Sequence, residues 1–252
     1  MMRKTIGSQS VAGGERFATT QWSLVVAAAD RRGAEADAAL AALCERYWYP
    51  VYAFVRRRGH SAADAQDLTQ EFFATLVEKE YLRSTDRQRG RFRTFLLTAV
   101  CRFLSKQADR ARAKKRGGGR RPLSLDFADA EGRYLLEPSE LCTPEMLYER
   151  RWALTLLDRA IERLGADYAG KGKRDLFERL KPHLIAGTAE AEHGELASEL
   201  NMTVGALKVA LHRLRRRFGE MLKQEIADTV AGPEEIEDEI GRLLAAVGMP
   251  GA

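Results

Sequence analysis

The chain has 252 residues, of which 45% are hydrophobic and 31% are charged, and its formal net charge is +5. This composition excludes an intrinsically disordered chain, and the length is enough for two modest domains with cores of their own. No stretch approaches the roughly 18 continuous apolar residues of a membrane span, and the first residues lack the apolar core of a signal peptide, so we expect no membrane insertion.

The cysteine and histidine residues indicate neither a disulfide framework nor a metal site. Cys44, Cys101 and Cys142 are widely spaced and odd in number, which fits a reducing, cytoplasmic location. The four histidines form no close pair with one another or with the cysteines, so we expect no metal and no cofactor. Because no cluster of polar residues typical of catalysis is found, we expect a protein that is not an enzyme.

Helical periodicity begins near residue 34, after an N-terminal extension (residues 1–33) of small and polar residues. The first helix contains Pro50, which is expected to kink or split it. A second helix is predicted over 61–78, where Ser61 and Asp64 have the spacing of a capping box. A third follows from about residue 92, with an apolar core face and a surface rich in arginine. Residues 34–111 are therefore predicted to form a first helical domain.

Residues 112–142 are predicted to form a flexible linker, because they are basic, then rich in glycine, and then contain two prolines. Helices resume near Pro144, and residues 143–224 form the second predicted domain. An acidic C-terminal extension (residues 225–252) ends in a helix with an apolar stripe. No strand pattern is found, so the predicted fold is all-α, with two helical domains joined by the linker and a C-terminal helical extension.

Residues 195–218 have the pattern of a helix-turn-helix. Ala197 is small where two helices must cross closely, Asn201 and Met202 form the turn, and Thr203 is a good N-cap for the second helix. That helix has a leucine stripe on its inner face. Its outward face carries Lys208, His212, Arg213, Arg215 and Arg216. A basic solvated helix in a bundle is the alternative, but turn, small residue and cations together favour DNA binding in the major groove.

Three segments, in this order, resemble regions of the sigma-70 family of RNA polymerase sigma factors. AspAlaGlnAspLeuThrGlnGluPhe (64–72) is similar to the core of region 2, and the segment 91–103 resembles the helix that follows it. ThrValGlyAlaLeuLysValAlaLeuHisArgLeuArg (203–215) resembles the promoter-binding helix-turn-helix of region 4. Two such domains joined by a linker are typical of the small extracytoplasmic-function (ECF) type.

The resemblance implies a transcription initiation factor that binds core RNA polymerase at its β′ clamp and β flap and directs promoter-specific initiation. It assigns polymerase docking to the second helix, with the contact residues Asp64, Asp67, Leu68, Gln70 and Glu71. From the residues alone, a solvated helix face explains this stretch equally well.

The resemblance also implies two groups of contacts with promoter DNA. The minus-ten element is assigned to Arg91, Arg93, Arg102 and Lys106, and the minus-thirty-five element to Thr203, Lys208, Val209, His212, Arg213 and Arg216. Val209 departs from the family pattern, in which a small polar residue is common at this position. Phe95 stands where many members have tryptophan, although its periodicity favours a core position.

Two questions stay open at this point. A stand-alone helix-turn-helix regulator that does not engage RNA polymerase explains residues 195–218 but leaves 61–78 unexplained. The second question is how activity is restrained: by an anti-sigma factor, or by self-inhibition through the C-terminal extension. In the second case, the acids of 225–239 are expected to cover the cations of the recognition helix, and the alternative is that the extension only packs beside region 4.

Overall fold

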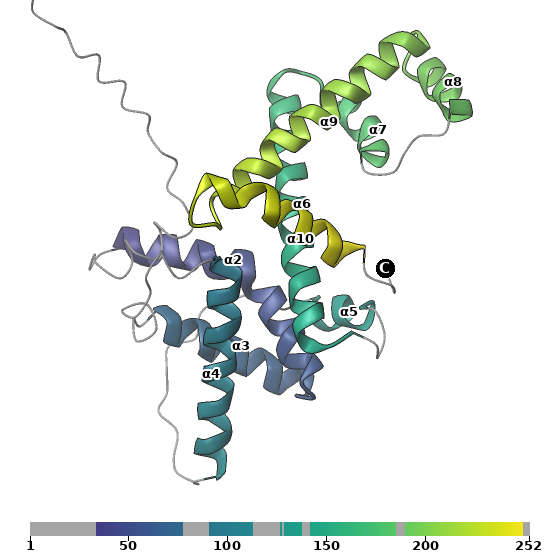
Figure 1. The fold of residues 1–252 in the computed structure, drawn as a ribbon. Helices are drawn as coiled ribbons and strands as arrows, with labels where there is room; N and C mark the ends of the chain where they lie inside the picture. The colour runs from purple at the N-terminus through teal and green to yellow at the C-terminus, as the bar shows by residue number, and fades with distance from the viewer. Residues whose placement is uncertain are drawn as a thin grey trace, which may run out of the picture.

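The computed structural model describes residues 34–77, 91–112, 127, 129–137, 142–184 and 190–248. Within these ranges every regular element is helical, which confirms the predicted all-α class (Figure 1). The elements are α2 (Ala34–Arg57), α3 (Ala62–Val77), α4 (Phe92–Arg112), α5 (Ala130–Leu135), α6 (Pro144–Gly170), α7 (Arg174–Leu180), η3 (Lys181–His183), α8 (Glu190–Glu199), α9 (Val204–Ala227), η4 (Pro233–Glu235) and α10 (Ile236–Val247). None of the described helices is long and apolar enough to cross a membrane.

Helices α2, α3 and α4 form the first bundle. The Ser61 hydroxyl accepts the backbone N–H of Asp64 at 3.1 Å and donates to its carboxylate at 2.7 Å, so the predicted cap of α3 is present. The rings of Phe72 and Phe103, with centroids 5.7 Å apart, join α3 to α4. Pro50 lies inside α2, and the helix continues through it instead of splitting. Buried neighbours such as Val51 hold this part of α2 against the core.

A short helix, α5, lies within residues 112–142, where the sequence predicts only a linker. The carboxylate of Glu131 accepts hydrogen bonds from the Tyr52 hydroxyl at 2.7 Å and from the Arg56 guanidinium at 2.6 and 2.9 Å. The bond from Arg56 also lowers the pKa of Glu131. Because α5 has only six residues, it offers no apolar period to detect, and its contacts with α2 stabilise it.

Helix α6 connects the two halves of the chain (Figure 1). Its N-terminus is capped by Thr143, whose hydroxyl accepts the Met146 N–H at 3.2 Å. Trp152 stacks on Tyr47 of α2 with ring centroids 4.2 Å apart, and both side chains are fully buried. Further along, α6 packs against α7, α9 and α10. The two helical domains therefore share one continuous core through α6.

Helices α8 and α9, joined by a short turn, lie where the sequence predicts a helix-turn-helix. Asn201 has a φ of 51° in the turn, and the Met202 N–H donates to the Ala197 carbonyl at 2.9 Å. Thr203 caps α9 by accepting the Ala206 N–H at 3.2 Å. The inner stripe of α9 is buried as predicted, with Leu207, Leu211 and Leu214 at 2% exposure or less.

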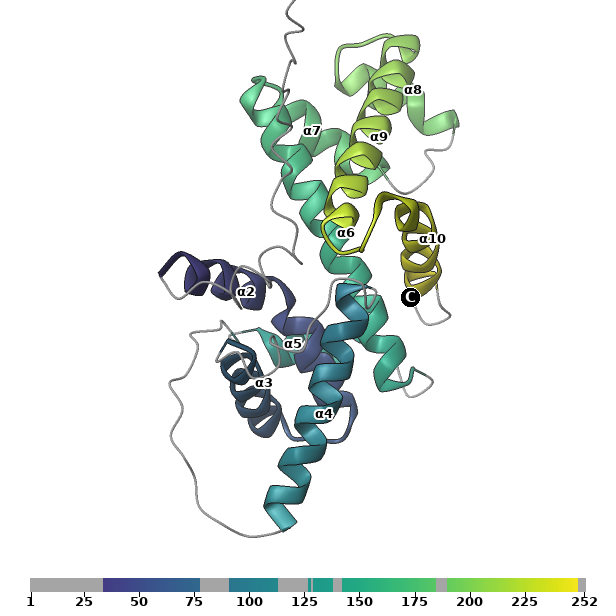
Figure 2. The ribbon, with the colours of Figure 1, turned by 60° about the vertical axis from the view of Figure 1, so that its left-hand side comes forward.

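The C-terminal helix α10 follows a turn at Gly232 and Pro233, as predicted, and packs on α6 and α9 (Figure 2). Leu243 and Ala246 of its apolar stripe are buried. Glu239 is also fully buried on this helix. A carboxylate in such a position needs partners, because a buried charge without them is strongly unfavourable.

Candidate functional site

The predicted promoter-contacting residues of α9 lie on its exposed face. Thr203, at the start of the helix, both caps α9 and is exposed. Val209 is 49% exposed on this side of the helix. The exposed cations and polar residues of this face are Lys208, His212, Arg213 and Arg216. Arg216 also pairs with Glu220 at 3.3 Å, one turn along the helix.

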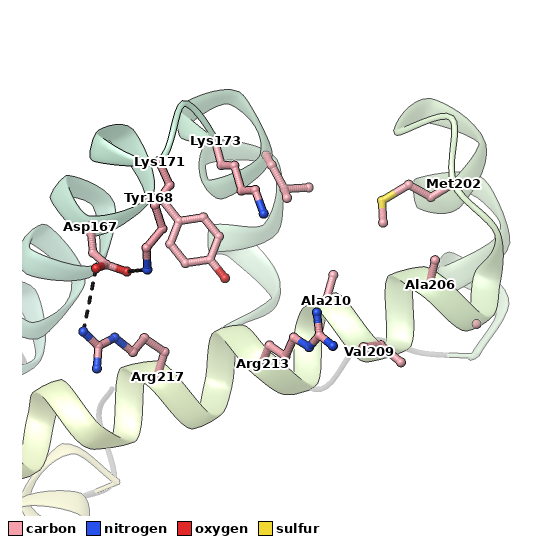
Figure 3. A pocket seen from close by; sticks show the side chains of 12 residues that line it. Asp167, Tyr168, Lys171, Lys173, Met202, Ala206, Val209, Ala210, Arg213 and Arg217 are labelled. Atoms are coloured by element: carbon pink, nitrogen blue, oxygen red, sulfur yellow. Dashed lines mark hydrogen bonds and ion pairs between the residues drawn. The ribbon is translucent and has the colours of Figure 1, made fainter.

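A groove of about 620 Å³ lies between α9, the end of α6 and the start of α7 (Figure 3). Of the predicted promoter contacts on α9, Val209 and Arg213 line it. Tyr168, Leu176 and Met202 give it an apolar lining, and its cationic residues are Lys171, Lys173, Arg213 and Arg217. Asp167 pairs with Lys171 at 2.6 Å and with Arg217 at 3.7 Å. The hydrogen bond from Lys171 lowers the pKa of the Asp167 carboxyl, which therefore stays ionised.

Lys171 and Lys173 are candidate DNA contacts that the sequence reasoning missed. Both are exposed, in a turn that Gly172 makes possible with a φ of 67°. The turn joins α6 to α7 and so brings these lysines to the groove beside Arg213. Two lysines around a glycine are a local signal of a basic turn, but their position beside α9 depends on the length of α6.

The predicted minus-ten residues are in two different environments. Arg102 and Lys106, on the later part of α4, are exposed. Arg91 and Arg93, at its start, are engaged by carboxylates from α10 and α6. Arg93 is only 6% exposed. Phe95 is half-buried and packs against the core, as its periodicity predicts.

Four ion pairs surround the start of α4. Arg91 pairs with Asp238 and, at 2.8 Å, with Glu239. Arg93 pairs with Glu239 at 2.6 Å and with Glu149 of α6. The hydrogen bond from Arg91 lowers the pKa of Asp238, so this carboxylate is charged at neutral pH. No local pattern indicates these contacts, because Arg93 and Glu239 are 146 positions apart.

Self-inhibition at the recognition helix would place the acids of α10 beside the early cations of α9, and they do not lie there. Asp238 and Glu239 contact the start of α4, and Glu237 pairs with Lys223 near the end of α9 at 2.5 Å. The early turns of α9, with Lys208 and Arg213, lie beyond the part of this helix that α10 covers (Figures 1 and 2). Of the two possibilities left open for the extension, the described residues fit packing beside the second helical domain, because the apolar stripe of α10 docks on α6 and on the later part of α9.

The predicted docking residues of α3 lie on its outer side. Asp64 and Asp67 are exposed, and Leu68, Gln70 and Glu71 are half-buried. Phe72 and Leu76, on the opposite side, are fully buried. Helix α3 lies in the lower part of both views, far from α8 and the start of α9 at the top (Figures 1 and 2).

Metal and thiol chemistry find little support in the described part of the chain. No group of three or more histidine, cysteine, aspartate or glutamate side chains is placed to hold a metal ion there. Cys44, Cys101 and Cys142 are all free thiols. Burial raises the pKa of the Cys44 thiol to about 12, so it is not a nucleophile at neutral pH.

Comparison with known proteins identifies part of the chain. Residues 43–114 match the family model of sigma-70 region 2, a span that includes α3, α4 and the later part of α2. No curated protein and no solved structure matches the chain. The match is confined to the first helical bundle and covers less than a third of the chain.

Proposed function

We propose that this chain, with a sigma-70 region 2 domain over residues 43–114, is a sigma factor of the ECF type. It binds core RNA polymerase and directs promoter-specific transcription initiation in the bacterial cytoplasm, without a catalytic residue or cofactor of its own. One observation carries the proposal. The region 2 match and a helix-turn-helix with a cationic face lie at opposite ends of one all-helical chain (Figure 1).

The proposed polymerase contact is the outer side of α3. Asp67 is exposed there, and Asp64 is exposed one turn earlier, where it also belongs to the N-terminal cap. Carboxylates at a protein interface speed association and fix its register when the partner offers cations. The partner proposed for α3 is the β′ clamp, and the β flap is proposed to contact region 4.

The proposed DNA contacts follow from the exposed cations. Helix α9 enters the major groove at the minus-thirty-five element, with Lys208 and Arg213 positioned to reach base edges. Arg102 and Lys106 on α4 contact phosphates near the minus-ten element. Lys171 and Lys173 add positive charge beside Arg213, where the DNA backbone passes next to the recognition helix.

A stand-alone helix-turn-helix regulator explains α8 and α9 but gives no role to the region 2 domain. Size-exclusion chromatography of the chain with purified core RNA polymerase separates the two proposals. We expect co-elution at a 1:1 ratio in the absence of DNA. Elution of the chain separately from core polymerase at micromolar concentrations would contradict the sigma-factor proposal and leave the DNA-binding regulator.

The base contacts of α9 give a specific prediction. Lys208→Ala and Arg213→Ala should each weaken binding to the minus-thirty-five element by about 1–3 kcal/mol, and the loss should depend on DNA sequence. Arg216→Ala removes a more distal cation and should weaken binding to all DNA sequences by the same amount. Fluorescence anisotropy with selected and scrambled duplexes measures both effects. Equal losses of affinity that do not depend on DNA sequence, for all three variants, would show that α9 contacts only phosphates and makes no base-specific contact.

A further inference from the structure

The start of α4 is enclosed by the C-terminal half of the chain. The Phe92 N–H donates to the Thr229 carbonyl at 2.9 Å, in the connection between α9 and α10. The Tyr148 hydroxyl of α6 donates to the Arg93 carbonyl at 2.9 Å. The backbone at this point is thus bonded to two segments that are distant in sequence. These bonds place the neighbouring arginine side chains directly beside α10.

The carboxylates of α10 occupy the hydrogen-bonding groups of both arginines. The side chain of Glu239 is 1% exposed and lies between Arg91, at 2.8 Å, and Arg93, at 2.6 Å. Asp238 contacts Arg91 from the outer side, and its side chain is 57% exposed. The two arginine side chains retain 17% and 8% exposure. In this arrangement neither guanidinium is open to a second anion of similar size.

Guanidinium groups bind carboxylates and phosphates through the same planar set of N–H donors. A DNA phosphate at Arg91 therefore has to take the place of Asp238 or Glu239. At Arg93 it has to take the place of Glu239, because the other partner of Arg93, Glu149, belongs to α6. The apolar stripe of α10 packs mainly on α6 and α9, with Leu243 and Ala246 buried and the stripe residues Ile236, Ile240 and Val247 partly buried. The carboxylate pairs are thus a substantial part of what fixes α10 against α4.

We propose that α10 is an internal competitor for DNA at the start of α4. Asp238 and Glu239 hold Arg91 and Arg93 in the free protein, and DNA phosphates displace them, which releases α10 from α4. The inference rests on the proposed function, because it takes the two arginines to be promoter contacts. It differs from simple packing in one consequence: removing the carboxylates strengthens DNA binding.

The test uses the full chain and a near-isosteric pair of substitutions, Asp238→Asn with Glu239→Gln. The control is Glu234→Gln with Glu237→Gln, which changes the net charge equally. Both control glutamates are exposed, and Glu237 pairs with Lys223 of α9. The probe is a fluorescent 30-base-pair duplex of arbitrary sequence, measured by anisotropy at 50 and 200 mM salt.

We expect the Asp238→Asn, Glu239→Gln variant to bind the duplex about tenfold more tightly than the control at 50 mM salt, with the difference narrowing at 200 mM. Equal affinities for variant and control would overturn the proposal. Weaker binding by the variant, together with a lower melting temperature, would also overturn it and leave α10 a packing element.

A second measurement needs no substitution. In hydrogen–deuterium exchange of the unmodified chain, saturating duplex should increase exchange across residues 236–247 and at the Phe92 amide. Binding of the duplex without change in these amides would overturn the proposal even if the variant failed to fold. Co-elution of the same proteins with core RNA polymerase tests the sigma-factor proposal separately. Normal co-elution with unchanged exchange removes only the role of α10, whereas loss of co-elution in the unmodified chain contradicts the sigma-factor proposal.

Discussion

Replacing Trp152 by Ala is expected to lower the free energy of unfolding by about 3–5 kcal/mol, a large part of the stability of a typical domain. Trp152 is fully buried, stacks on Tyr47 of α2 and lies 5.8 Å from the Phe92 ring of α4, centroid to centroid. Its loss leaves a cavity between α2, α4 and α6. Urea unfolding followed by circular dichroism measures the change.

Trp152→Phe is the matched control, because it keeps an aromatic ring over Tyr47. The Trp152 indole N–H is buried and has no hydrogen-bond partner among the described residues. Its removal therefore costs no hydrogen bond, and we expect a loss of less than about 1.5 kcal/mol. Similar losses for the two variants would show that the stacked ring does not join the two helical domains.

Reversing two charges on α3, Asp67→Arg with Glu71→Arg, is expected to weaken binding to core RNA polymerase by about 100-fold or more. Asp67 is exposed and Glu71 is half-buried one turn later, while the core side of the helix is unchanged. Like charges placed opposite one another at an interface cost several kcal/mol, and about 1.4 kcal/mol corresponds to a factor of ten. Titration of labelled core polymerase measures the affinity.

A double reversal of equal charge away from α3, Glu162→Arg with Glu178→Arg, controls for the change in net charge. Both glutamates are exposed, on α6 and α7. Helical content should be the same in both variants. If the α3 variant binds core polymerase as tightly as the control, α3 does not lie in the interface.

Local signals in the sequence were sufficient where an element is defined by its own residues. Ser61 predicted the start of α3, and Thr203 with the buried leucine stripe predicted α9, because caps and apolar periods act within one helix. The helix α5 was missed for the opposite reason. Its hydrogen bonds to Tyr52 and Arg56 come from α2, and six residues carry too little pattern of their own.

The environment of the candidate site was harder to predict than its residues. Arg93 was predicted as a surface cation, and nothing within α4 shows that Glu239 and Glu149 neutralise it. Trp152 lies in the second predicted domain, but the ring stacked on it belongs to Tyr47 of the first. Such contacts depend on how α6 and α10 cross the bundle, and a sequence period gives only which face of a helix is buried.

The central claim, that this chain is a sigma factor, is tested most directly by run-off transcription with purified core RNA polymerase. Templates are first selected from random DNA by the complex of the chain with core polymerase. We predict transcripts of one defined length that depend on the chain, require no ATP hydrolysis for initiation, and are lost with Asp67→Arg, Glu71→Arg. Absence of a specific transcript from every selected template, with the chain folded and present in excess, would contradict the account.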